Sequence, residues 1–91
     1  ARVIVTSPSH SAVALDDEKD RTPLPVRLAK GEGLLAKRMV EIAREEGIPV
    51  MQNVPLARSL FAEGTENAYI PKDLIGPVAE VLRWVQSLQG R

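Results

Sequence analysis

The stretch from Val3 to Leu15 constrains the fold more than any other, because two apolar runs flank a short polar insert. Valine, isoleucine and threonine favour extended backbone, so each run is typical of a β-strand. Pro8 lacks a backbone N–H and holds the residue before it out of the helical region, so the chain must turn or kink at the insert Ser7-Pro8-Ser9-His10. We therefore expect a strand over Arg2–Thr6, a turn, and a second strand over Ser11–Leu15.

The composition limits the class of protein. A chain of 91 residues is long enough for one small domain, and 44% apolar against 3% aromatic residues predict an aliphatic core. Twelve basic and twelve acidic residues balance to zero, which argues against nucleic acid as a partner. The chain has no cysteine and one histidine, so we expect no disulfide, no structural zinc and no cofactor.

The sequence contains no recognisable membrane or targeting segment. No apolar run approaches the roughly 20 residues that span a bilayer, and no signal peptide is present. The sequence begins with Ala1, and strand-forming residues follow almost at once. We expect residues 1–91 to be a single domain and a fragment of a longer protein.

The middle of the chain predicts a strand followed by a helix. Two prolines precede the apolar residues Val26–Ala29, which places this strand at a sheet edge or at a strand start. Lys30-Gly31-Glu32-Gly33 is expected to break the strand, and it lacks the spacing of a phosphate-binding loop. Leu34–Glu46 then has helical periodicity and ends before Gly47, a residue typical of helix C-termini.

The second half of the chain adds a strand and two helices. Ile48–Met51 has the length of a buried strand, and Asn53 is placed to cap a helix over Leu56–Ala62. The remaining segments are a loop over Glu63–Tyr69, one turn over Lys72–Ile75, and a final helix from Pro77 to about Leu88. The predicted order is β-β-β-α-β-α-α, an α/β fold in which a sheet of about four strands is flanked by helices.

The apolar positions predict the core. In the first helix the expected buried face consists of Leu35, Met39, Ile42 and Ala43. In the final helix the expected stripe consists of Val78, Val81, Leu82, Val85 and Leu88, with Trp84 packing beside it. The predicted core packs Leu35, Met39, Ile42, Val50, Leu82 and Val85 against a sheet face formed by Val3, Val5, Val13 and Val26.

Few residues are placed for catalysis. Ser7, Ser9 and His10 offer a nucleophile and a base, but Ser9 and His10 are adjacent and point to opposite faces of an extended chain. A pair of Ser7 and His10 across a turn would still need an oxyanion hole, so a hydrolase acting on a separate substrate is disfavoured. The charge run over residues 16–21 is interpreted as a solvated loop, with a binding patch as the alternative. Arg58 is interpreted as solvated, with a functional role as the alternative.

Several short motifs follow one another along the chain. They are Val3-Ile4-Val5-Thr6, Ala12-Val13-Ala14-Leu15, Thr22-Pro23-Leu24-Pro25, Lys30-Gly31, Ile42-Ala43-Arg44-Glu45-Glu46-Gly47-Ile48-Pro49-Val50, Val54-Pro55-Leu56-Ala57-Arg58-Ser59-Leu60, Ile70-Pro71 and Ala79-Glu80-Val81-Leu82-Arg83-Trp84. Each is weakly specific alone. Together, in this order and spacing, they resemble the cytoplasmic domain of the type III secretion export-switch proteins, the FlhB/YscU family of flagella and injectisomes.

The resemblance implies a self-cleavage motif at the polar insert. In the family the motif is Asn-Pro-Thr-His. The Asn side-chain nitrogen attacks its own main-chain carbonyl, forms a succinimide and expels the proline nitrogen, and a turn raises the effective concentration. The matching residues here are Ser7, Pro8, Ser9 and His10, with Ser7-Pro8 at the position of the cut bond. Ser7 has no amide nitrogen, so we expect the chain to stay uncleaved.

By the same resemblance we expect a domain that helps to gate export and to switch substrate specificity. The parent protein would lie in the bacterial inner membrane, with this domain on the cytoplasmic side. Its partners would be other export-apparatus proteins and secreted substrates, with no nucleic acid and no small-molecule substrate. Two alternatives remain open: an active autoprotease that cuts between Ser7 and Pro8, and a soluble stand-alone adaptor paralogue.

Overall fold

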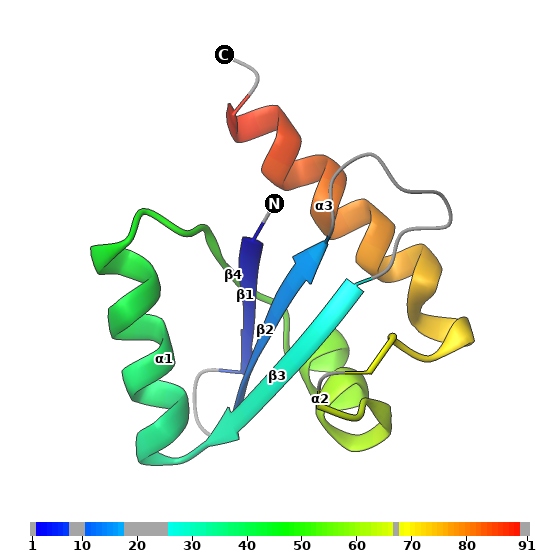
Figure 1. Ribbon diagram of the computed structural model, residues 1–91, viewed down its shortest axis with the longest axis horizontal. Helices are drawn as coiled ribbons and strands as arrows, with labels where there is room; N and C mark the ends of the chain where they lie inside the picture. The colour runs from blue at the N-terminus through cyan, green and yellow to red at the C-terminus, as the bar shows by residue number, and fades with distance from the viewer. Residues whose placement is uncertain (1, 8–10, 18–25, 67, 90–91) are drawn as a thin grey trace.

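A four-stranded mixed sheet with helices on both faces forms the domain (Figure 1). The computed structural model describes residues 2–7, 11–17, 26–66 and 68–89. In chain order its elements are β1 (Arg2–Ser7), β2 (Ser11–Asp17), β3 (Val26–Glu32), α1 (Leu34–Glu45), β4 (Val50–Gln52), α2 (Val54–Glu63), the 3₁₀ turn η1 (Lys72–Leu74) and α3 (Ile75–Gln89). The predicted order β-β-β-α-β-α-α and the predicted α/β class are confirmed.

The strands follow the order β3-β2-β1-β4 across the sheet. β1 runs antiparallel to β2, and β2 runs antiparallel to β3. After the crossover through α1, β4 returns beside β1 and parallel to it. The third strand is predicted at a sheet edge or at a strand start, and the structure places β3 at an edge; β4 forms the other edge.

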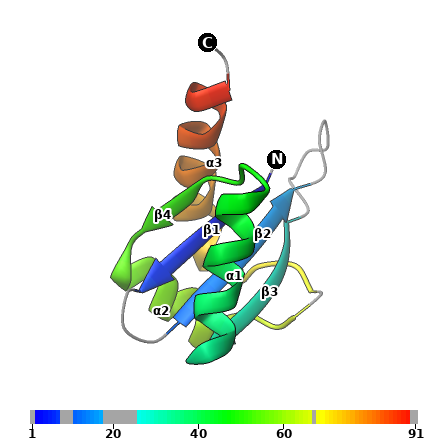
Figure 2. The ribbon, with the colours of Figure 1, turned by 90° about the vertical axis from the view of Figure 1, so that its left-hand side faces the viewer.

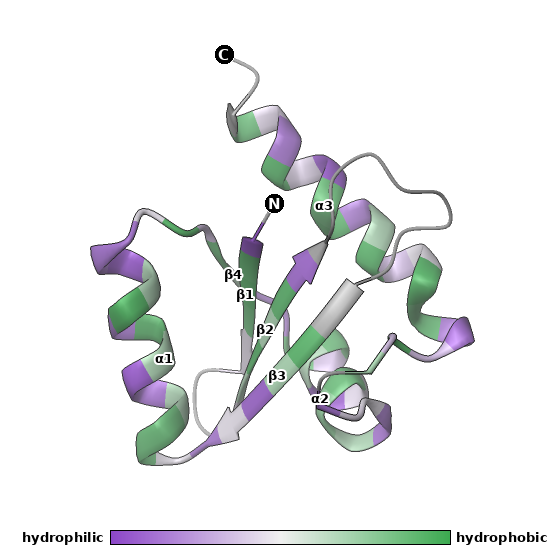
Figure 3. Ribbon diagram, in the orientation of Figure 1, coloured by the Kyte–Doolittle hydropathy of each residue, from purple (hydrophilic) through white to green (hydrophobic). Residues whose placement is uncertain are grey.

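The larger part of the core lies between the sheet and the pair α2 and α3, which cover one face (Figures 1 and 2). Its buried side chains are all aliphatic, as the composition predicts: Val3, Val5, Val13, Leu15, Leu28, Leu56, Ala57, Leu60, Leu74, Val78, Val81, Leu82 and Val85. Figure 3 shows hydrophobic residues along the strands and on the helices that face them. Trp84 is partly buried against this cluster, which confirms its packing role.

α1 packs on the opposite face of the sheet (Figure 2), and its buried side chains are small. Ala36 and Ala43 are buried with Ile4 of β1. Leu35 is 57% exposed and Ile42 is 41% exposed, so the predicted face of this helix is wrong at both positions. The physical reason is that alanines let the helix axis approach the sheet closely, which leaves the larger side chains on the flank.

The predicted single core is also wrong in its layout. Successive residues of a strand face opposite sides of the sheet, so Val3 and Val5 face the layer of α2 and α3 while Ile4 faces α1. Met39 and Val50 are partly buried in the α1 layer, whereas Leu82 and Val85 are buried in the layer of α2 and α3. Of the six predicted core residues, Leu35 and Ile42 are exposed, and the other four divide between the two faces. The side chain of Val26 lies outside the described part of the chain.

β3 continues to Glu32, so the expected break at Lys30-Gly31-Glu32-Gly33 is wrong for its first three residues. A Cβ atom at Gly31 would lie 2.7 Å from both Leu35 Cγ and Met39 Sδ. Glycine is therefore needed here because α1 crosses the strand closely, and it does not end the strand.

The later elements begin or end a few residues from their predicted bounds. β4 is a half-buried edge strand and not a buried central one, because its outer side has no described neighbour in the sheet. α3 begins at Ile75, two residues before Pro77. Leu88 is 50% exposed and lies outside the core, contrary to prediction. No helix in the described part of the chain is long and apolar enough to cross a membrane.

Candidate functional site

The end of the β1–β2 ladder carries the first residue of the predicted motif. Ser7 ends β1 and pairs with Ser11, which begins β2. Both serines are buried, with 4% and 7% of their surfaces exposed. Pro8, Ser9 and His10, the other three predicted site residues, lie outside the described residues. The described part of the motif is thus a buried serine whose only side-chain group is a hydroxyl.

Two hydrogen bonds of Thr6 hold the chain just before Ser7. The Thr6 Oγ1 donates to the carbonyl oxygen of Ser11 at 3.1 Å. The carbonyl oxygen of Thr6 accepts a hydrogen bond from the main-chain N–H of Asn53 at 3.0 Å. Both bonds fix the strand that ends in Ser7.

Asn53 also caps α2, as the sequence predicts. Its Oδ1 accepts a hydrogen bond from the N–H of Leu56 at 3.2 Å, and its backbone is extended. One residue therefore joins the strand of the motif to the start of a helix. Sequence reasoning found the cap but missed the bond to Thr6, because no local pattern signals a pairing between segments so far apart.

A groove of about 1040 Å³ adjoins Ser7 and Ser11. It lies between α1 and the side of the sheet formed by β1 and β4, which Figure 2 shows beside each other. Its lining includes Thr6, Ser7 and Ser11 at the motif, Lys37, Val40, Glu41 and Arg44 of α1, and Ile48, Val50 and Gln52 at β4. Sequence reasoning did not predict this groove, because it depends on where α1 crosses the sheet.

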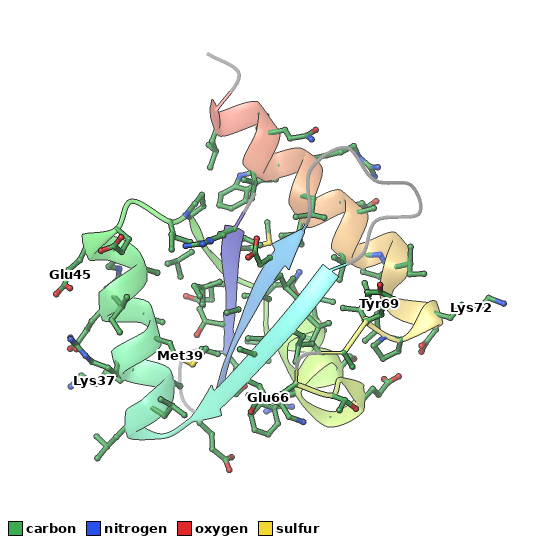
Figure 4. The ribbon with its side chains drawn as sticks, in the orientation of Figure 1. Lys37, Met39, Glu45, Glu66, Tyr69 and Lys72 are labelled. Atoms are coloured by element: carbon green, nitrogen blue, oxygen red, sulfur yellow. The ribbon has the colours of Figure 1, made fainter. Side chains whose placement is uncertain are left out.

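The α1 wall of the groove has an excess of positive charge. Lys37 and Arg44 both line it and are exposed. Glu41 lies between them but is paired with Arg38, with 3.4 Å between Oε1 and Nη1. Within the described part of the chain, neither Lys37 nor Arg44 forms an ion pair. In Figure 4, Lys37 extends from the outer side of α1, whereas Met39 turns toward the strands.

Arg58 and Asp16, at the two other candidate positions, do not line the groove. Arg58 is exposed on α2, as expected of a solvated residue. In the charge run over residues 16–21, Asp16 pairs with Arg2 across the β1–β2 ladder at 3.7 Å, and most of the other residues lie outside the described ranges. Among the residues that the structure describes, no three His, Asp or Glu side chains are grouped to hold a metal ion.

In the described part of the chain, one titratable group with an altered pKa, Glu63, lies away from the motif. Glu63 ends α2, and Asp73 lies in η1. Repulsion by the Asp73 carboxylate raises the pKa of Glu63, and slight desolvation and a hydrogen bond between the two carboxyl groups raise it further. This pair affects how stability depends on pH and supplies no group to the groove.

Comparison with known proteins gives the family. A family model described as the FlhB HrpN YscU SpaS family matches residues 1–85. The chain is 45% identical over 89 residues to the flagellar biosynthetic protein FlhB of Yersinia enterocolitica, covering 98% of this chain and 23% of that protein. It is 38% identical over 84 residues to the Yop proteins translocation protein U of Yersinia pestis, covering 92% and 24%. The chain therefore spans about a quarter of the length of these relatives.

Solved structures share the fold. The cytoplasmic domain of FlhB from Shewanella putrefaciens matches with a TM-score of 0.85 and 34% identity, covering 98% of this chain and 71% of that one. A variant EscU C-terminal domain, with an asparagine replaced by aspartate, matches with a TM-score of 0.82 and 34% identity, covering 89% and 74%. An EscU domain with the asparagine replaced by alanine also matches with a TM-score of 0.82.

Proposed function

Because this chain belongs to the FlhB, HrpN, YscU and SpaS family, we propose that it is a docking and gating domain of a type III secretion export apparatus. In this role it binds other export-apparatus proteins and secreted substrates and helps to set which substrates are exported. Similarity to both a flagellar protein and a Yop translocation protein supports an export role common to the two systems. The parent protein lies in the bacterial inner membrane, and this domain lies on the cytoplasmic side, as the name of the Shewanella domain suggests.

The observation that carries the proposal is the residue at the end of β1. Ser7 is buried in the ladder beside Ser11, and the sequence resemblance matches it to the asparagine of the family motif. A serine hydroxyl cannot supply the nitrogen that closes a succinimide ring. The domain therefore acts with the Ser7-Pro8 bond whole, and β1 stays covalently joined to β2. EscU domains with a substituted asparagine keep this fold, which supports a folded domain without that side chain.

The competing autoprotease would need a different nucleophile. The Ser7 hydroxyl can attack only the carbonyl before it, that of Thr6, and a cut there would fall before Ser7 and not between Ser7 and Pro8. The Thr6 carbonyl oxygen is engaged by Asn53. A single main-chain donor of this kind is ordinary in a sheet, so it does not favour the autoprotease.

A chimera tests the export role. Residues 2–89 replace the matching segment of Yersinia enterocolitica FlhB in a strain that lacks its own copy, and flagellar proteins are measured in the culture supernatant. We expect export to be restored for at least one class of flagellar protein, from an uncleaved chimera. A chimera that is made at normal level and inserted in the membrane, yet exports nothing, would contradict the proposal.

The coding sequence upstream of Ala1 separates the membrane protein from the stand-alone adaptor. Transmembrane segments encoded directly before this domain are the expected result. A start codon with no such segments would favour the adaptor paralogue instead.

A further inference from the structure

We propose that the groove beside Ser7 binds an extended, acidic segment of a partner protein, which adds as a fifth strand to the free edge of β4. This inference gives a binding mode to the docking role and rests on the proposed function.

The edge of β4 supplies main-chain groups for such a strand. In the described sheet, β4 pairs with β1 alone. The carbonyl of Pro49 accepts from Ile4 at 2.9 Å, and the N–H of Asn53 donates to Thr6 at 3.0 Å. Because main-chain groups alternate in direction along a strand, those of Val50 and Gln52 point away from β1. An extended peptide can pair with these outward groups.

The walls of the groove suit the side chains of an added strand. Every second side chain of that strand turns toward α1. There it meets Val40, Ile48 and Val50, which line the groove and are only partly buried. Small and β-branched apolar side chains fit this surface, and they also favour extended backbone.

The charges on α1 select the polar side chains of the partner. Lys37 and Arg44 are seven positions apart, which is roughly 10 Å along a helix. Strand residues four positions apart point to the same face and are separated by a similar distance of roughly 13 Å. With Glu41 neutralised by Arg38, the two cations face acidic side chains at that spacing. The outward backbone of β4 favours a polypeptide over nucleic acid, and the chain has no net charge to attract a polyanion.

Selection from a displayed library of random peptides tests the binding mode. The library is selected on the purified chain and counter-selected on the double variant Lys37→Glu, Arg44→Glu. We expect the enriched peptides to carry two acidic residues four positions apart with a β-branched residue midway between them, so that all three face α1, and to bind the double variant at least tenfold more weakly. The matched control, Lys72→Glu with Arg83→Glu, makes the same charge change at exposed positions of η1 and α3 and is expected to bind as the chain does.

A second measurement distinguishes strand addition from other docking. The amides of Val50 and Gln52 are expected to exchange with solvent more slowly when a selected peptide is bound. Gln52→Pro removes an outward N–H and no bond to β1, so it is expected to abolish binding while circular dichroism shows an intact fold.

The proposal is overturned if no acidic peptides are enriched, if the double variant binds them as well as the chain, or if the two amides gain no protection. These readouts involve neither cleavage nor secretion. A negative result therefore rejects strand addition only. The export role is tested separately by the chimera.

Discussion

The main-chain N–H of Asn53 donates to the carbonyl oxygen of Thr6 across 3.0 Å, and this bond fastens the strand that ends in Ser7 to the cap of α2. The Asn53 side chain holds the first turn of that helix through Leu56. Asn53 therefore connects the end of β1 to the first turn of α2 through one main-chain and one side-chain hydrogen bond.

Asn53→Ala is expected to lower the free energy of unfolding by about 1 kcal/mol, because the first turn of α2 loses its side-chain cap. The main-chain bond to Thr6 does not depend on the side chain and is kept. Asn53→Asp retains an acceptor and serves as the control. Urea unfolding followed by circular dichroism measures both, and an unchanged midpoint for Asn53→Ala would show that the cap does not contribute.

Lys30→Met is expected to destabilise the domain by roughly 1–2 kcal/mol, because two partly buried carbonyls lose a charged donor. Lys30 Nζ donates to the carbonyl oxygens of Phe61 and Gly64 at 2.9 Å each, and lies 5.1 Å from the centroid of the Phe61 ring. The exposed Lys37→Met is the control, expected to change stability by less than about 0.5 kcal/mol. Equal midpoints for the two variants would contradict this role of Lys30.

Leu60→Ala and Ile42→Ala compare the two layers of the fold. Leu60 is fully buried under the sheet, so its truncation is expected to cost roughly 2–5 kcal/mol. Ile42 is 41% exposed on the flank of α1, so its truncation is expected to cost less than about 1 kcal/mol. Thermal or urea unfolding measures both costs. A larger loss of unfolding free energy for Ile42→Ala than for Leu60→Ala would contradict the packing face that the structure gives to α1.

Glu63→Gln is expected to make stability depend less on pH. The pKa of Glu63 is raised in the folded state by Asp73, so the folded chain binds its proton more tightly than the unfolded chain. Stability of the chain therefore falls as pH rises from the ordinary glutamate range through the raised pKa. The variant should be at least as stable at neutral pH, and its advantage should shrink as pH falls.

Thermal midpoints between about pH 4 and pH 7 measure this dependence. Glu45→Gln, on exposed α1, is the control for the loss of one carboxylate. An advantage of Glu63→Gln that grows as the pH is lowered would contradict a raised pKa at Glu63.

Local patterns predicted most of the elements, because their causes lie in neighbouring residues. The β-branched run at Val3, the cap at Asn53 and the glycine at Gly47 each act within a few residues. The face of α1 could not be predicted in the same way. Leu35 and Ile42 give a stronger apolar signal than Ala36, but the approach of the helix to Gly31 decides which side is buried.

The candidate site was predicted only in part. The motif is visible as Ser7 beside Pro8, because the chemistry of one side chain can be read from its identity. The groove, the bond from Asn53 to Thr6 and the free edge of β4 depend on how distant segments meet. No local periodicity in the sequence indicates contacts between distant segments, so these features could be identified only from the structure.

An uncleaved Ser7-Pro8 bond is the central expectation for this domain, and Ser7→Asn is the variant that tests its chemistry. The substitution restores the side-chain nitrogen that closes a five-membered ring, while the β1–β2 ladder still holds the residue. If Ser7→Asn also stays whole, the second departure from the family motif, at Ser9, becomes the next position to change. Ser7→Ala is the control that lacks both nitrogen and hydroxyl.

Intact mass spectrometry under denaturing conditions, after incubation at neutral pH, measures cleavage most directly because it separates fragments that remain paired in the sheet. We predict one mass, that of the whole chain, for the unaltered protein and for Ser7→Ala. For Ser7→Asn we predict two fragments divided between residues 7 and 8. Purified unaltered protein that is already divided between Ser7 and Pro8 would contradict the proposed loss of cleavage.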